Sequence, residues 1–196
     1  KGKDLDKFPV APGQFMIFRF LDKQRRWQAH PFSLSKPVDN KEIRISAKAV
    51  GDFTADLPYL KPGTKVIIDG PFGVFTDTKT EQKVLLVAGG IGITPLRSLL
   101  EHMNRQGKDV VLVNNNRDQK DLVFGEELQN LGAKVINIFT NQEGKLNRDK
   151  LRSLVPDLNQ RLAYVCGPPA MIKAVRSDLQ ELGLNKNRIK YEKFSL

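Results

Sequence analysis

The chain has very little cysteine and histidine. Its 196 residues include one cysteine, Cys166, and two histidines, His30 and His102. A single thiol excludes an internal disulfide and also a plant-type iron–sulfur cluster, which needs four cysteine ligands. Two histidines do not provide for a haem held by paired histidines or for a histidine-rich metal site. We therefore predict no metal bound by this chain.

Long apolar runs and acidic residues are also scarce. No run approaches the length that spans a bilayer, and no signal peptide is recognisable, so we expect a soluble chain that is part of a larger protein. Asp and Glu number 22 against 32 Lys and Arg, which gives a net charge of +10. The basic residues do not alternate with aromatic ones, so we predict no nucleic-acid binding. An anionic cofactor, a negatively charged membrane or simple solvation remain as explanations of the charge.

The first part of the chain, residues 1–78, has the pattern of short strands separated by turns. The predicted strands are Gln14–Leu21, Phe32–Ser35, Glu42–Ser46 and Lys65–Asp69. This pattern predicts a small antiparallel β-barrel domain. Four strands are few for a closed barrel, so we expect a further strand or hairpin before Lys1.

From residue 83 to residue 196, strands and helices alternate. The predicted strands are Val84–Ala88, Val110–Val113, Lys134–Phe139, Leu162–Cys166 and Arg188–Phe194, and the predicted helices start at Pro95 or span Leu122–Leu131, Arg148–Leu154 and Ala170–Leu182. Repeated β–α units predict a doubly wound, Rossmann-like α/β domain that binds ligands at the carboxyl ends of its parallel strands. The polar segment Thr76–Gln82 is the predicted domain boundary.

One glycine-rich turn stands between the first predicted strand and helix of this second domain. The sequence Gly89-Gly90-Ile91-Gly92 is followed by Thr94 as the predicted N-cap and Pro95 as the predicted first helical residue. Free N–H groups and a helix dipole at such a turn suit a pyrophosphate. The turn lacks the third glycine of G-x-G-x-x-G and the lysine of a P-loop. On these residues alone, a turn that binds no ligand explains the pattern about as well.

Five motifs in order resemble the ferredoxin–NADP reductase superfamily, and together they cover nearly the whole chain. They are His30–Ser35 (His-Pro-Phe-Ser-Leu-Ser), Val50–Thr54, Asp69–Gly73, Ala88–Pro95 and Val165–Pro169. The His-Pro-Phe-Ser opening and the late Glu192-Lys193-Phe194 are most similar to the dehydrogenase domain of NADPH oxidases and ferric reductases.

The resemblance implies that the first domain binds FAD. His30 stands where the superfamily usually has arginine, and Pro31 follows it. Phe32 would pack on the isoalloxazine ring, and the Ser33 hydroxyl would approach flavin N5. A second flavin segment, which would meet the pyrophosphate, comprises Lys48, Gly51, Phe53 and Thr54. Without the resemblance, a core phenylalanine and a strand-end hydroxyl explain Phe32 and Ser33 equally well.

The resemblance also implies that the second domain binds NADPH, with its pyrophosphate on the turn from Gly89 to Pro95. Arg117 would pair with the 2′-phosphate, although the neighbouring Asp118 keeps NADH possible. The nicotinamide would lie at Cys166, Gly167, Pro168 and Pro169. Cys166 is assigned a positioning role because no histidine lies nearby as a base, and by itself it would be an ordinary buried residue.

Phe194 is the last predicted site residue. The resemblance implies that this aromatic ring covers the flavin face where nicotinamide must sit, whereas the alternative is a ring that fills the core. The predicted catalytic residues are therefore Ser33, Cys166 and Phe194.

The activity implied by these resemblances is an FAD-dependent NAD(P)H oxidase or reductase that passes hydride from NADPH to FAD and then electrons to an acceptor. The implied acceptor is a haem in a transmembrane domain of the same parent chain, at the cytoplasmic face of the plasma membrane, with superoxide or reduced iron as the product. One alternative is a soluble or ferric-reductase-type NAD(P)H:flavin or iron reductase. Another is a nucleotide-binding regulatory subunit without turnover.

Overall fold

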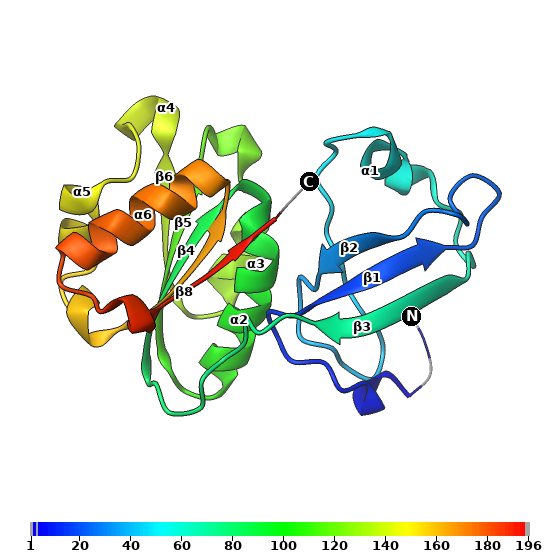
Figure 1. Ribbon diagram of the computed structural model, residues 1–196, viewed down its shortest axis with the longest axis horizontal. Helices are drawn as coiled ribbons and strands as arrows, with labels where there is room; N and C mark the ends of the chain where they lie inside the picture. Colours follow the sequence, from blue (N-terminus) through cyan, green and yellow to red (C-terminus); the bar gives the residue numbers. More distant parts are fainter. Residues whose placement is uncertain (1, 3, 195–196) are drawn as a thin grey trace.

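The computed structural model describes residues 2 and 4–194, which form two lobes side by side (Figure 1). The N-terminal lobe contains a three-stranded antiparallel sheet, and the C-terminal lobe contains a five-stranded parallel sheet with helices on both faces. No helix in this described part of the chain has the length and apolar character needed to cross a membrane.

The N-terminal sheet has the strand order β2-β1-β3, and both pairings are antiparallel. The strands are β1 (Phe15–Phe20), β2 (His30–Ser33) and β3 (Val66–Phe72), and the helical segments are α1 (Asp52–Asp56) and the 3₁₀ turns Leu5–Lys7 and Leu57–Tyr59. Along β1, Met16, Phe18 and Phe20 are buried in alternation, as expected for a sheet with one core face. The antiparallel sheet is as predicted from the sequence.

Two strand predictions in this lobe need correction. Glu42–Ser46 forms only a single bridge, between Ile45 and Leu34, although Ile45 still packs against the lobe's core. The Asp39 carboxylate accepts the N–H groups of two following residues and turns the chain there, which shortens the stretch available for pairing. The strand predicted from Phe32 instead starts at His30, because β2 is an edge strand that tolerates Pro31.

The C-terminal sheet has the strand order β6-β5-β4-β7-β8, with every pairing parallel, as predicted. Its strands are β4 (Lys83–Gly89), β5 (Asp109–Asn116), β6 (Lys134–Phe139), β7 (Leu162–Gly167) and β8 (Ile189–Lys193). Its helices are α2 (Ile93–Arg105), α3 (Gly125–Asn130), α4 (Thr140–Glu143), α5 (Arg148–Leu154) and α6 (Pro169–Glu181). The helix predicted at Leu122–Leu131 is shorter, because a 3₁₀ turn at Gln119–Asp121 and a left-handed Phe124 come before α3.

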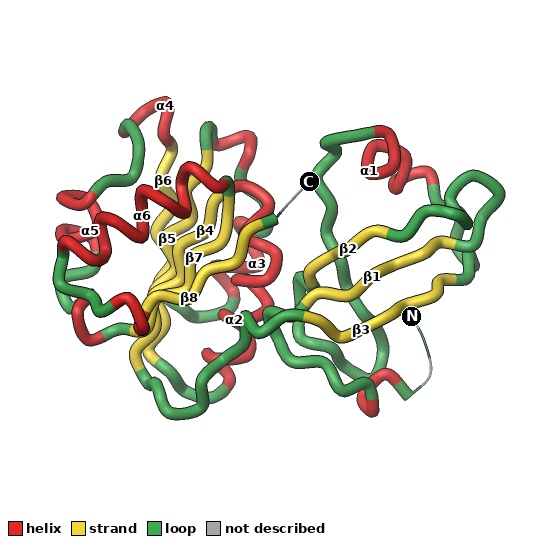
Figure 2. Tube along the Cα trace, in the orientation of Figure 1, coloured by secondary structure: helices red, strands yellow, loops and turns green. Residues whose placement is uncertain are grey.

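Two apolar clusters sandwich the parallel sheet. Along β4, Val84 and Leu86 face the cluster that includes α2 and α3, while Leu85 and Val87 face the cluster that includes α5 and α6. All four side chains are fully buried, which is typical of a parallel sheet covered on both faces. Helices α2 and α3 lie on the side of the sheet that faces the N-terminal lobe (Figure 2).

The segment that joins the lobes is fixed to the C-terminal lobe. The Tyr164 hydroxyl donates to the Thr76 carbonyl at 2.9 Å, and burial raises the pKa of this tyrosine to about 12. The Lys108 ammonium donates to both carboxylate oxygens of Asp77 at 2.8 Å and to the Thr78 carbonyl at 2.8 Å. Hydrogen bonds therefore hold residues 76–78 in place against the C-terminal lobe.

Removing the buried charge of Lys108 tests this anchoring. In Lys108→Met the buried Asp77 carboxylate loses its ammonium partner and keeps, among the described residues, only the His102 ring at 3.7 Å, so we expect the free energy of unfolding to fall by roughly 3–5 kcal/mol. Lys83→Met is the matched control, since its more exposed pair with Asp157 contributes at most about 1 kcal/mol. Urea unfolding followed by circular dichroism measures both changes, and equal losses in the two variants would contradict the anchoring.

Candidate functional site

The glycine-rich turn leads from β4 into α2 by way of a 3₁₀ turn at Gly90–Gly92. Helix α2 begins at Ile93 with Gly92 as its N-cap, so Thr94 is not the cap that the sequence predicted. The Thr94 hydroxyl instead donates back to the Ile91 carbonyl at 3.0 Å. Pro95 is the third helical residue, a position whose missing N–H still costs no intrahelical hydrogen bond.

Two glycines in this turn have different geometric roles. Gly90 has a φ of +54° and lies beside open space, whereas a Cβ at Gly92 would overlap the carbonyl of Cys166 and come within 2.7 Å of the Gly167 nitrogen. The turn therefore combines close packing against the end of β7 with an unobstructed outer side. The N-terminus of the 13-residue helix α2 opens there, and its N–H groups and dipole suit a pyrophosphate.

The predicted nicotinamide residues lie together at the end of β7. The strand ends at Gly167, and α6 begins at Pro169 after the exposed Pro168. Cys166 is fully buried, and burial, followed by the nearby Glu192 carboxylate, raises the pKa of its thiol well above the usual range. The thiol therefore stays protonated at neutral pH, in a state that suits packing and not nucleophilic attack.

A path of neighbouring residues leads from Ser33 in one lobe to Cys166 in the other. Ser33 is the register partner of Phe15 in the β1–β2 pair. A Cβ built on Gly73 would lie 3.3 Å from the Phe15 ring and 3.5 Å from the Glu192 Oε1 atom. Glu192 is in turn the register partner of Cys166 in the β7–β8 pair. Two predicted site residues from distant parts of the sequence thus border one junction between the lobes, toward which β8 runs in Figure 1.

Two buried polar atoms at this junction have no hydrogen-bond partner among the described residues. They are the hydroxyl oxygen of Ser33, a residue only 6% exposed, and the Oε2 atom of Glu192. Buried polar atoms are normally satisfied, so this pair is unusual and fits a polar ligand between the lobes. A flavin ring offers hydrogen-bonding groups of the kind that these atoms lack.

Glu192 is a site residue that was missed when the site was predicted from the sequence. Burial raises the pKa of its carboxyl to about 7. The available signal was its position in the last predicted strand, because a parallel pairing with the strand of Cys166 places the two side by side. Phe194 follows β8 and packs, half buried, against the core cluster that contains Cys166.

The predicted flavin strand carries an aromatic cluster. The His30 ring lies 3.8 Å from the Phe53 ring, centroid to centroid, and Phe32 stacks on Phe53 at 6.4 Å. Phe32 also contacts Phe18 edge-on at 6.0 Å. Pro31 is exposed opposite Ile17. The structure therefore brings the first flavin segment and Phe53 together around one half-buried aromatic surface.

The rest of the second flavin segment is less suited to phosphate than the sequence predicted. The Thr54 hydroxyl accepts the N–H groups of Val50 and Gly51 at 3.0 and 3.2 Å and donates to the Gly51 carbonyl. The one hydroxyl proton of Thr54 is therefore already used in a hydrogen bond at the start of α1. Lys48 is exposed, so its ammonium is the group in this segment that can meet an anion.

The end of β5 carries three asparagines and then Arg117. Asn114 and Asn116 are buried, and each has one side-chain amide atom without a hydrogen-bond partner among the described residues. Arg117 is exposed, while the Asp118 carboxylate accepts the Asn141 amide at 2.8 Å. The Asp118 carboxylate is thus hydrogen-bonded to Asn141, and the exposed Arg117 guanidinium follows buried asparagines whose amide atoms lack partners among the described residues.

Within the described residues, no group of three or more His, Cys, Asp or Glu side chains is placed to hold a metal ion.

The fold and this junction define a two-domain oxidoreductase that binds a flavin and a nicotinamide nucleotide. Residues 2–76 match the family described as an FAD-binding domain, and residues 86–177 match the family described as an oxidoreductase NAD-binding domain. The chain belongs to the ferredoxin–NADP reductase superfamily, and its cofactors are FAD and NAD(P)H.

Curated relatives include reductases of several kinds. The chain is 29% identical to the ferredoxin reductase component of 3-ketosteroid-9-alpha-monooxygenase from Rhodococcus rhodochrous, covering 97% of this chain and 57% of that protein. It is 29% identical to NADH oxidoreductase HCR of Escherichia coli, with 92% and 59% covered. It therefore spans somewhat more than half the length of these relatives.

A solved structure supports the fold directly. The FAD/NAD-binding domain of nitric oxide dioxygenase from Vibrio cholerae superposes with a TM-score of 0.84 at 24% identity, covering 94% of this chain and 85% of that one.

The packing of Gly92 gives a direct test of the turn. We expect Gly92→Ala to destabilise the protein and weaken NAD(P)H binding, because the methyl group would overlap the β7 backbone. Gly90→Ala is the control: it meets no atoms, and its left-handed φ costs only about 1–2 kcal/mol. Thermal unfolding and nucleotide titration measure the effects. The packing argument fails if Gly92→Ala is as stable as Gly90→Ala.

The raised pKa of Glu192 predicts an unusual pH dependence. The usual carboxyl pKa of 4.5 applies to the unfolded chain, and the folded value is about 7, so the folded protein binds more protons between these values. Stability contributed by this group is therefore lost as pH rises from about 4.5 through about 7. We expect Glu192→Gln to gain stability relative to the wild type over that range. Urea unfolding at a series of pH values measures the difference, and parallel curves would contradict it.

Proposed function

We propose that this chain is a flavin-dependent NAD(P)H reductase module, with FAD on residues 1–78 and NAD(P)H on residues 83–196. The observation that supports the proposal is the approach of the two lobes at Gly73 and Glu192, the register neighbour of Cys166, together with the buried and unpartnered Ser33 hydroxyl and Glu192 Oε2 atom. FAD, when bound, supplies hydride acceptance from nicotinamide and onward electron transfer.

The chain's own residues bind and orient. The turn from Gly89 to Gly92 would seat the dinucleotide pyrophosphate, and the buried Ser33 hydroxyl would be a hydrogen-bond donor for the flavin ring. Cys166 packs at the floor of the junction. Beside it, burial raises the pKa of the Glu192 carboxyl to about 7, so this group can take up or release a proton near neutral pH. Burial of these groups excludes water from the reacting atoms.

The acceptor we propose is the redox centre of a separate partner protein. The matched relatives are named as reductase components of monooxygenases and as an NADH oxidoreductase, which favours this assignment. A haem in a membrane domain of a longer parent chain, with superoxide as product, is the second candidate. The His30-Pro31-Phe32-Ser33 opening and the net charge of +10 favour it, because a basic protein docks readily beneath an anionic leaflet at the cytoplasmic face.

Anaerobic stopped-flow mixing of the FAD-loaded chain with NADPH or NADH tests the proposed activity. We expect rapid loss of the oxidised flavin absorbance with at least one nucleotide. Adding ferricyanide, a ferredoxin or a haem protein in a second mix then ranks acceptors by the rate of flavin reoxidation. Flavin reduction no faster than with free FAD would reject the reductase assignment and leave a binding subunit.

The preference for NADPH is tested at Arg117. If its guanidinium pairs with the 2′-phosphate, Arg117→Ala should weaken NADPH binding by about 1.5–3 kcal/mol and leave NADH binding unchanged. Arg152→Ala is a matched control, because this exposed arginine lies on α5 on the other face of the sheet. Fluorescence titration gives both affinities, and an equal change for the two nucleotides would refute the assignment.

A further inference from the structure

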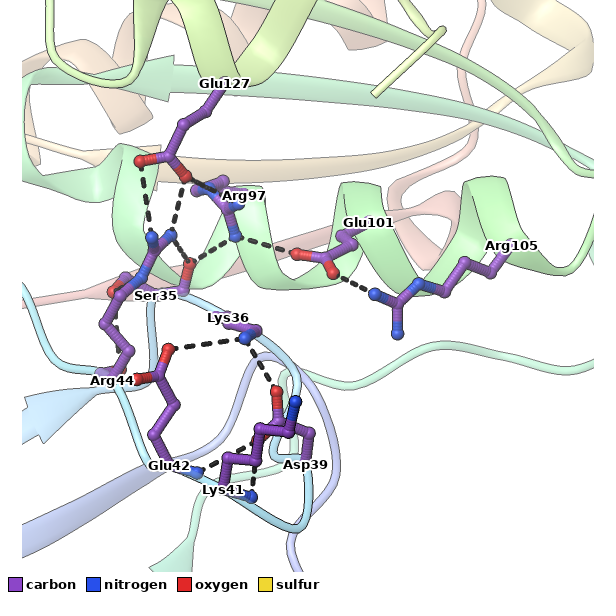
Figure 3. A network of polar contacts seen from close by, with 10 residues as sticks. All are labelled: Ser35, Lys36, Asp39, Lys41, Glu42, Arg44, Arg97, Glu101, Arg105 and Glu127. Atoms are coloured by element: carbon purple, nitrogen blue, oxygen red, sulfur yellow. Dashed lines mark hydrogen bonds and ion pairs between the residues drawn. The ribbon is translucent and has the colours of Figure 1, made fainter. Parts of the chain in front are cut away.

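A network of charged side chains crosses from one lobe to the other (Figure 3). We call it the interlobe network and define it by six residues. They are Ser35 and Arg44 from the N-terminal lobe, Arg97, Glu101 and Arg105 from α2, and Glu127 from α3. Arg97 lies at its centre, one turn into the helix that starts at the dinucleotide turn.

The Arg97 guanidinium is buried, and its N–H groups donate hydrogen bonds to three different residues. Nη1 donates to the Ser35 carbonyl at 2.8 Å and to Glu101 Oε2 at 2.9 Å, while Nε donates to Glu127 Oε2 at 2.9 Å. Its side chain is only 6% exposed. Such a planar, always charged group fixes the direction of each partner, which an ammonium cannot do.

The contact with Ser35 reaches the flavin side of the junction. Ser35 is fully buried and lies two residues after Ser33. Its carbonyl accepts from Arg97 and also from Arg44 Nη2 at 3.1 Å. A shift of α2 against the N-terminal lobe would therefore break a charge-assisted hydrogen bond next to the flavin strand.

Glu127 completes the interlobe network from α3, and the ring of Phe124, the residue before that helix, lies beside the network. Glu127 accepts from Arg44 Nη2 at 3.0 Å as well as from Arg97, and although burial acts in the other direction, the two guanidiniums hold its pKa below the usual range. The Phe124 ring lies 5.3 Å from Arg44 and 5.6 Å from Arg97. Phe124 adopts a left-handed φ of +62°, which a bulky residue rarely does, and this conformation accompanies the placement of its ring beside both arginines.

Another contact between the lobes is apolar and leaves their relative angle less constrained. A Cβ at Gly13 in the N-terminal lobe would lie 3.1 Å from the Leu99 side chain on α2. Close packing of this kind sets a distance of approach but has no preferred direction. Directional contacts come from the interlobe network, in which Arg97 touches both lobes and both helices.

We propose that Arg97 is a positioning residue that holds the flavin strand against the dinucleotide turn at the separation needed for hydride transfer. The proposal rests on the proposed function for its two binding sites. Hydride transfer requires reacting atoms about 3–3.5 Å apart, and a misplacement of about 1 Å can slow such a step roughly a hundredfold. Loss of Arg97 therefore slows flavin reduction at saturating nucleotide and leaves the affinity for nucleotide largely intact.

The first test measures geometry and needs no cofactor. Spin labels on Lys61→Cys and Lys186→Cys report the distance between the lobes, because both positions are exposed and the native Cys166 is buried. We expect one narrow distance distribution in the otherwise unchanged chain and a broadened one with Arg97→Met. Arg105→Met is the matched control, since this arginine is 66% exposed at the outer end of the network, and its distribution stays narrow.

The second test separates rate from affinity in the FAD-loaded protein. We expect Arg97→Met to lower the limiting rate of flavin reduction by roughly tenfold or more, with the dissociation constants for NAD(P)H and FAD changed less than about threefold. Arg97→Lys, which keeps the charge without the fork, should give an intermediate rate and provides the test if the methionine variant does not fold.

The results of the two tests distinguish the positioning role of Arg97 from the proposed reductase function. A narrow distribution in both Arg97 variants, or a rate loss explained wholly by weaker nucleotide binding, overturns the positioning role. If the unsubstituted protein fails to transfer hydride while Arg97→Met still broadens the distance distribution, the proposed function fails and Arg97 still sets the lobe geometry.

Discussion

The close approach of two separately folded lobes is the constraint on which the rest of this structure depends. An antiparallel sheet provides one binding surface and a parallel sheet the other, and neither lobe contains both. Ser33 and Cys166 are 133 residues apart in the chain, and the register neighbours of these two residues, Phe15 and Glu192, both lie beside Gly73. A flavin and a nicotinamide can react only where both surfaces meet.

Residues of very different character maintain that approach. Gly92 lets the dinucleotide turn pack on the backbone of β7, and the pair of Lys108 with Asp77 fixes the linker to the parallel sheet. Arg97 then connects α2 to the carbonyl of Ser35. Buried charges of this kind contribute little net stability compared with apolar packing, but their geometry is demanding. Their retention at the lobe junction is consistent with a requirement for orientation.

The sequence predicts the parallel half of the fold well, because its three central strands, β4, β5 and β7, are continuous apolar runs ending at glycine or asparagine. It predicts the glycine turn and the end of β7 for the same reason. It places Glu42–Ser46 in a strand because Ile43 and Ile45 alternate with polar residues, whereas in the structure the Asp39 carboxylate accepts the N–H groups of Lys41 and Glu42 and the segment forms a turn before its single bridge. The roles of Glu192 and Arg97 cannot be predicted from the sequence, because they depend on which strands and lobes become neighbours. Local periodicity carries no such information.

The central claim is direct hydride transfer across the lobe junction, and the most direct measurement is a single-turnover isotope experiment. The FAD-loaded chain is mixed without oxygen with nucleotide that carries deuterium on one or the other face of nicotinamide C4. The account predicts slower loss of the oxidised flavin absorbance for one deuterated face and unchanged loss for the other, since a fixed junction presents a single face. Equal rates for both faces, or no flavin reduction, would contradict it.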